Sequence, residues 1–124
     1  MALSQILWKL ENLANKLGYK IVGSRTSAIL PSAKLIQINT RQTAIKRAWT
    51  IAHEIGHIVT LKKCIREVGP RVLSGATHEW PSLEAEFRAW RATDKLVRKL
   101  GIYSNKYLQY KHSCMRSYYY SAMR

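Results

Sequence analysis

The chain has 124 residues, and its 21 Lys and Arg against seven Asp and Glu give a formal net charge of +14. This length fits one compact domain spanning residues 1–124. A run of about 18 apolar residues, which a membrane-spanning helix needs, is missing, and the N-terminus lacks the apolar stretch of a signal peptide. Cys64 and Cys114 are isolated in the sequence, which favours free thiols over a disulfide. We therefore expect a cytoplasmic protein with no membrane contact.

The first third of the chain predicts one helix and a small sheet. Apolar residues recur at helical spacing from Ser4 to Leu17, and Gly18 ends this N-terminal helix (residues 1–18). A turn is expected at 23–27, where Gly, Ser and Thr cluster. The strand candidates are residues 19–22, 28–30 and 34–39. Together they predict an antiparallel or mixed sheet.

The segment that follows, about 43–61, predicts a helix that carries the motif H-E-x-x-H at residues 53–57. Residues four apart lie on one face of a helix, so His53 and His57 can bind the same ion. Glu54, between them, is turned aside from the ion and can act on a water molecule beside it. Two imidazoles, one Zn²⁺ and a carboxylate base form the core of a hydrolytic site.

The surroundings of the motif strengthen this interpretation. In the run from 48 to 59, Thr50, His53, Glu54 and His57 form one narrow polar stripe, and the other residues are apolar or Gly. This pattern is typical of a buried helix that faces an internal cleft. The alternative is a core helix whose His residues only bond to neighbours, which leaves the buried Glu unexplained.

A catalytic zinc usually has a third protein ligand. The extended motif with Gly at 60 and His at 63 is excluded, because the chain has Thr and Lys there. A later helix, beginning near Ser82 and ending at Gly101, has Glu84 and Glu86 in its first turns. These two are about 200° apart around the helix, so only one can face the ion. His78, in the preceding loop rich in turn residues, is a further candidate.

The end of the chain, residues 101–124, predicts a basic, Tyr-rich C-terminal extension with a short helix over about 104–113. Bases and aromatic rings together suit contact with single-stranded nucleic acid. They equally suit Tyr packing on the domain with Lys stems outside. The residues in question are Tyr103, Lys106, Tyr107, Tyr110, Lys111, Arg116, Tyr118, Tyr119, Tyr120 and Arg124.

The chain resembles the ImmA/IrrE-like zinc metallopeptidases of bacteria, phages and mobile elements. The resemblance covers about residues 34 to 100. Ile36 to Asn39 is similar to the family's I-x-I-N segment, and residues 47–57 to its R-x-x-x-x-A-H-E-x-G-H segment. Glu86 to Ala89 matches the family's E-x-x-A segment. The Asp or Asn that often follows this Ala is Trp90 here, so a partner for a ligand His is missing or supplied elsewhere.

The resemblance implies an α+β, zincin-like fold, with a small mixed or antiparallel sheet packed on three to four helices. It implies that His53, His57 and Glu86 are ligands of one catalytic Zn²⁺ and that Glu54 is the general base. It also implies a minimal member of phage or mobile-element type, working in the host cytoplasm if phage-encoded.

We therefore expect a zinc metallopeptidase that cleaves a regulatory protein, such as a repressor or another acidic partner. The alternative is a basic module that binds nucleic acid or protein and whose zincin site is structural or inactive. The net charge of +14 attracts acidic or nucleic-acid partners in either case. The alternative is that Lys and Arg, which are not in one block, are spread over a solvated surface and serve solubility.

Overall fold

The structure is a computed structural model that describes residues 1–73 and 80–122. The elements in chain order are α1 (Leu3–Lys16), β1 (Lys20–Ser24), β2 (Ala28–Leu30), β3 (Leu35–Asn39), α2 (Ala44–Val68), the 3-10 helix η1 (Pro70–Leu73), α3 (Trp80–Lys99) and α4 (Asn105–Ala122). The predicted α+β class is confirmed, and it is compatible with a zincin-like fold. The chain divides into two compact units, residues 1–55 and 56–124, and α2 runs from one into the other.

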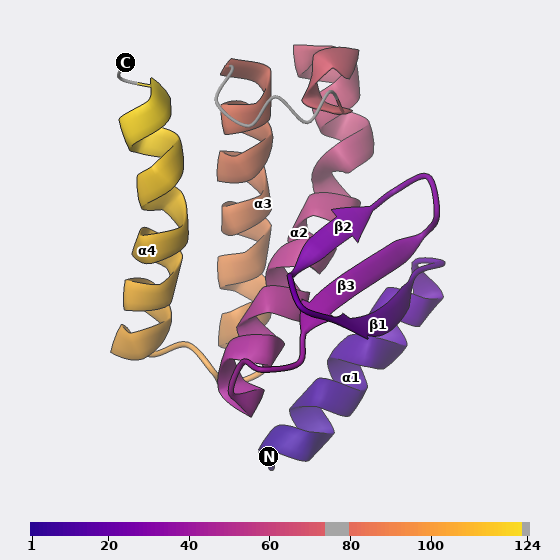
Figure 1. The fold of residues 1–124 in the computed structure, drawn as a ribbon, viewed down its shortest axis with the longest axis vertical. Helices are drawn as coiled ribbons and strands as arrows, with labels where there is room; N and C mark the ends of the chain where they lie inside the picture. Colours follow the sequence, from indigo (N-terminus) through magenta and orange to yellow (C-terminus); the bar gives the residue numbers. More distant parts are fainter. Residues whose placement is uncertain (74–79, 123–124) are drawn as a thin grey trace. The chain divides into compact units, whose positions relative to one another are not determined.

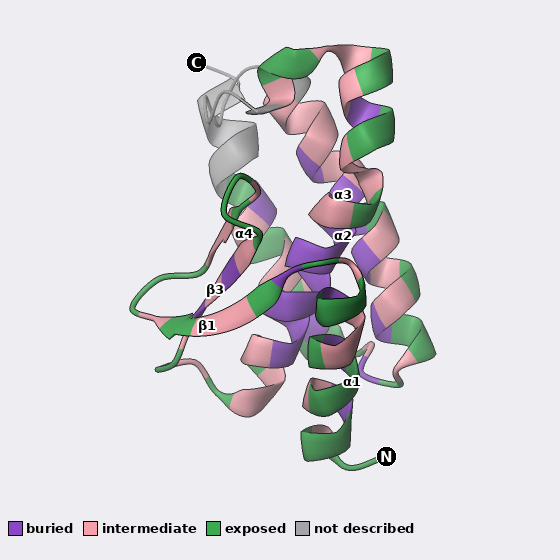
Figure 2. Ribbon diagram, turned by 90° about the vertical axis from the view of Figure 1, so that its right-hand side faces the viewer, coloured by how far each residue is buried: buried purple, intermediate pink, exposed green. Residues whose placement is uncertain are grey.

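The first unit combines α1 with a mixed sheet (Figure 1). The strand order is β1-β3-β2, with β1 parallel and β2 antiparallel to β3. On α1 the buried residues Ile6, Leu10 and Ala14 recur every four positions, so one stripe of the helix is covered. Figure 2 shows the exposed side of α1 in green. Alternate residues of β3, Ile36 and Ile38, are buried on one face of the sheet.

Strand β1 corrects the predicted turn at 23–27, because the strand continues through Gly23 and Ser24. These residues pair with Ile38 and Asn39 of β3, so ladder hydrogen bonds override the local turn preference. A Cβ on Gly23 would lie 2.8 Å from a methyl carbon of Thr40, so glycine suits this close approach.

The second unit contains the C-terminal part of α2 with α3 and α4. Figure 1 shows α3 between the other two helices. The largest fully buried side chains of this second unit are Trp90, Tyr107, Val97, Thr93 and Cys64. Helix α3 ends at Lys99, and Gly101, the predicted C-cap, follows it with a φ of +75°. The N–H groups of Gly101 and Ile102 donate to the carbonyls of Arg98 and Val97.

The helix predicted over about 104–113 is longer in the structure, because α4 continues from Asn105 to Ala122 and packs on α3. The Tyr107 hydroxyl donates to Asp94 at 2.6 Å, and the Lys111 ammonium donates to the other carboxylate oxygen at 2.7 Å. Tyr107 is fully buried, and its pKa is raised by that burial and by the bond to Asp94. Tyr107 therefore follows the second interpretation, with its ring in the core. The side chains of residues 117–124 lie outside those described.

Helix α2 is longer than the predicted 43–61, since it continues to Val68. Its added turns carry Glu67, which pairs with Arg88 of α3 at 2.9 Å. The hydrogen bond from Arg88 lowers the pKa of the Glu67 carboxyl. The contacts between α2 and α3 thus include residues beyond position 61, where the predicted helix ended.

Both Cys residues are free thiols, as predicted, and Cys64 is buried. Among residues 1–73 and 80–122, no helix combines the length and the apolar character that a bilayer crossing needs. The cytoplasmic location stays a prediction.

Gly56 sets the distance between α2 and α3. A Cβ at this position would lie 2.5 Å from the Ala89 carbonyl oxygen and 2.7 Å from the Thr93 hydroxyl. That hydroxyl already donates to the Ala89 carbonyl at 2.7 Å, so neither atom is free to move aside. Glycine is thus the residue that permits this helix contact.

We expect Gly56→Ala to destabilise the protein by up to about 2 kcal/mol. The overpacking costs typically about 1–3 kcal/mol, which outweighs the roughly 1 kcal/mol by which Ala favours a helix over Gly. Urea unfolding measures the difference. Val59→Ala, at an exposed position of the same helix, is the control and should change stability by less than about 0.5 kcal/mol. Stabilisation by Gly56→Ala would show that the two backbones do not approach this closely.

Candidate metal centre

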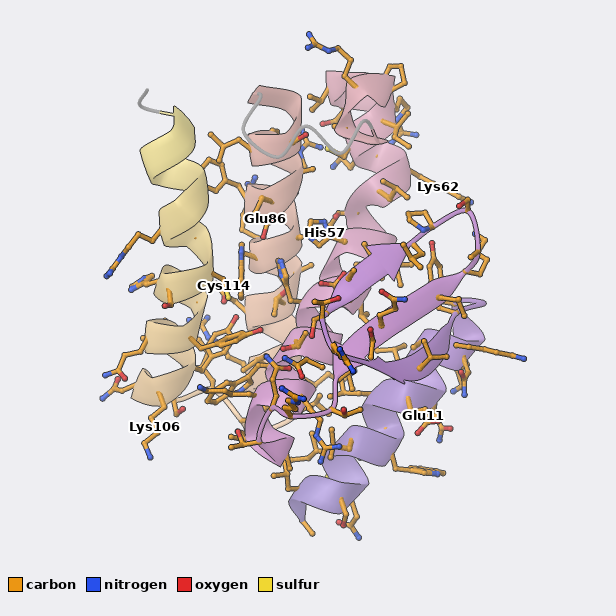
Figure 3. All side chains as sticks on the ribbon, viewed as in Figure 1. Glu11, His57, Lys62, Glu86, Lys106 and Cys114 are labelled. Carbon is orange, nitrogen blue, oxygen red and sulfur yellow. The ribbon has the colours of Figure 1, made fainter. Side chains whose placement is uncertain are left out.

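The centre is built on the contact between α2 and α3. The Nε2 atom of His57 lies 3.0 Å from the Oε2 atom of Glu86. Figure 3 shows these two side chains pointing toward one another from their helices. The Glu86 side chain is 7% exposed and that of His57 is 23% exposed, so the carboxylate is buried while the imidazole retains some access to solvent. A carboxylate buried this deeply requires polar partners.

His53 precedes His57 by one turn of the same uninterrupted helix and is buried. One nitrogen of each imidazole and one carboxylate oxygen of Glu86 lie within 4.8 Å of one another, so the three residues could hold a metal ion. Two imidazole nitrogens and one carboxylate oxygen are a donor set found in zinc hydrolases, which leave a fourth position open. The residues present therefore fit a zinc ion.

Glu54 is buried as well, at 9% exposure, and lies next to His53 in the helix. Among the described residues, the group that could hold a metal contains His53, His57 and Glu86 and does not include Glu54. Glu54 lies on α2, the same helix as both imidazoles, whereas Glu86 lies on α3.

Glu84 has a different environment from Glu86. Its Oε1 atom accepts a hydrogen bond from the Arg88 guanidinium at 3.0 Å and lies 3.7 Å from Arg91. Arg88 also pairs with Glu67 of α2, and its hydrogen bonds with the two carboxylates raise its pKa. Glu84 thus belongs to a partly exposed ion-pair network. His78, the other alternative ligand, lies outside the described residues.

Trp90 is the residue near the centre whose role the sequence did not indicate. Its indole Nε1–H donates to Oε1 of Glu86 at 3.0 Å. The signal was present in the spacing, because residues 86 and 90 are four apart on a helix and share a face. From the family resemblance, Trp90 had stood only as a departure from Asp or Asn.

These features define a small domain in which a helix with the H-E-x-x-H motif and a following helix bring together donors for a metal. The model of the peptidase family M78, described as the IrrE N-terminal-like domain, matches residues 10–71. The chain therefore belongs to the family of IrrE N-terminal-like domains. The match includes His53, Glu54 and His57 and ends before α3. The evidence for Glu86 as part of the centre is therefore its position in the structure and not the family match. No curated protein and no solved structure matched the chain.

We expect Glu86→Gln to weaken zinc binding by more than about 100-fold, since loss of a ligand should exceed the 10–100-fold effect of an outer partner. Glu84→Gln is the matched control, two residues away on the same helix, and should leave the zinc Kd within about twofold of wild type. Competition with a chromogenic chelator gives both values. Equal loss in the two variants would indicate a general charge effect instead of a ligand.

Proposed function

We propose that the protein is a zinc-dependent peptidase in which His53, His57 and Glu86 hold the ion. The observation that supports this most strongly is the group of two imidazole nitrogens and one buried carboxylate oxygen within 4.8 Å. Membership of a peptidase family supports the same reaction class. A metal that served only structure would usually have four protein ligands, whereas the three donors found among residues 1–73 and 80–122 leave a position for reacting groups.

A zinc ion held by His53, His57 and Glu86 would supply Lewis-acid chemistry, polarising the scissile carbonyl and making water a stronger nucleophile near neutral pH. Glu54 is the proposed general base, because it is a carboxylate beside the first imidazole in the sequence and is not one of the three metal donors. It accepts a proton from the attacking water and delivers it to the leaving amine nitrogen. The low exposure of Glu54 limits competition from bulk water during this transfer.

We further propose a regulatory protein, such as a repressor, as the substrate. The family resemblance supports this, and the net charge of +14 would favour encounter with an acidic partner. The basic binding module remains the competing hypothesis. It would bind oligonucleotides with an affinity that falls steeply with salt and would need no zinc.

We expect Glu54→Gln to keep zinc bound and to lower peptide hydrolysis by about 10²–10⁴-fold, the usual contribution of a positioned acid–base group. The change is nearly isosteric, so folding should be preserved. Cleavage of a peptide library, with products identified by mass spectrometry, measures the rate, and elemental analysis measures zinc.

Glu84→Gln again serves as the control and should cleave at the wild-type rate. Hydrolysis by Glu54→Gln at the wild-type rate would remove this residue from the reaction. Wild-type protein that binds no zinc, but binds oligonucleotides in a strongly salt-dependent manner, would instead support the binding module.

A further inference from the structure

The two oxygens of the Glu86 carboxylate have different partners. Oε1 accepts the indole hydrogen bond of Trp90, while Oε2 faces Nε2 of His57, each at 3.0 Å. We propose that Trp90 is a positioning residue that fixes the carboxylate so that Oε2 alone is presented to the metal. This inference rests on the proposed function, and it assigns Glu86 as a ligand through one oxygen.

Trp90 suits this role because of its chemistry and its place on the helix. A helical side chain leans toward the N-terminus, so residue 90 reaches back to residue 86. The indole has one N–H donor and no acceptor, so it can orient a carboxylate but cannot compete for a cation. Trp90 is 1% exposed, so its hydrogen bond is shielded from bulk water.

Two aromatic side chains of α4 contact the Trp90 ring. The Trp90 ring contacts Tyr107, with ring centroids 6.4 Å apart, and meets Tyr110 edge to face at 6.2 Å. One turn beyond Trp90, Asp94 accepts hydrogen bonds from Tyr107 and Lys111 and so fastens α4 to α3. Trp90 therefore connects the packing of α4 with Glu86, the proposed metal ligand. Neither α3 nor α4 lies within the family match.

The decisive comparison is Trp90→Phe against Tyr107→Phe. Trp90→Phe keeps an aromatic ring and removes the donor to Glu86, and we expect the zinc Kd to rise about 10–100-fold, as for other outer partners of metal ligands. Tyr107→Phe removes a buried hydrogen bond from the same helix pair but leaves Trp90 with a ring beside it. It should lower the melting temperature and leave the zinc Kd within about threefold of wild type.

A spectroscopic measurement separates positioning from stability. With Co²⁺ in place of zinc, the visible absorption bands report the ligand geometry. We expect these bands to shift in Trp90→Phe, where the carboxylate is free to rotate, and to match wild type in Tyr107→Phe. A wild-type Kd together with a wild-type cobalt spectrum in Trp90→Phe would overturn the inference.

A measurement on the unaltered protein covers the case in which Trp90→Phe does not fold. In the nitrogen–proton spectrum, the indole N–H of Trp90 should exchange with solvent far more slowly than that of Trp8, which is 63% exposed. Trp8→Phe identifies the reference signal. If every indole N–H exchanged as fast as that of Trp8, Trp90 would not be bonded to the carboxylate and the inference would be wrong.

These outcomes differ from failure of the proposed function. If the wild type binds zinc and Glu54→Gln loses cleavage, a neutral Trp90→Phe result removes only the positioning role. If the wild type binds neither zinc nor cobalt, the proposed function and the positioning role both fail.

Discussion

The close approach of α2 and α3 at Gly56 is the constraint on which the second unit depends. Because position 56 has no side chain, the backbone of α2 can come near the Ala89 carbonyl. One residue further along α2, His57 then meets Glu86, which lies nearly one turn before Ala89 on α3. A side chain at position 56 would separate the helices where a metal centre needs them close, so a glycine that is unfavourable for the helix is favourable for the site.

The same contact explains how an acid comes to be buried between the helices. Burying a carboxylate is costly unless both oxygens have partners. For Glu86 the partners come from different helices, a ring N–H on its own helix and an imidazole on the other. The arrangement therefore combines one fixed contact with one that a cation can replace. If fixed donors bonded to both oxygens, the carboxylate would be equally well stabilised, but neither oxygen would be available to a metal.

The sequence alone predicted most elements because their signals are local. The apolar stripe of α1 and the H-E-x-x-H helix follow from residue periodicity, the strand at 28–30 follows from turn residues on both sides, and the structure has all three. The errors concern tertiary contacts. Gly23 and Ser24 read as a turn until β3 pairs with them, and the helix after residue 104 reads as short until Tyr107 is seen buried against α3. Neither contact leaves a periodic trace in the sequence that could have predicted it.

In the candidate site, too, part of the outcome was predictable from the sequence and part was not. The difference between Glu84 and Glu86 depends on the residue four positions after each of them. Glu84 is followed by Arg88, a long charged side chain that remains near solvent, and the pair joins a network with Glu67. Glu86 is followed by Trp90, a largely apolar side chain with a single donor, which is buried and bonds to the carboxylate inside the protein. The two acids share a helix turn and a charge, yet the neighbour at this spacing assigns one to the surface network and the other to the interior. The E-x-x-A pattern marks which acid to suspect, while the identity of residue 90 gives the physical reason why that acid can be buried.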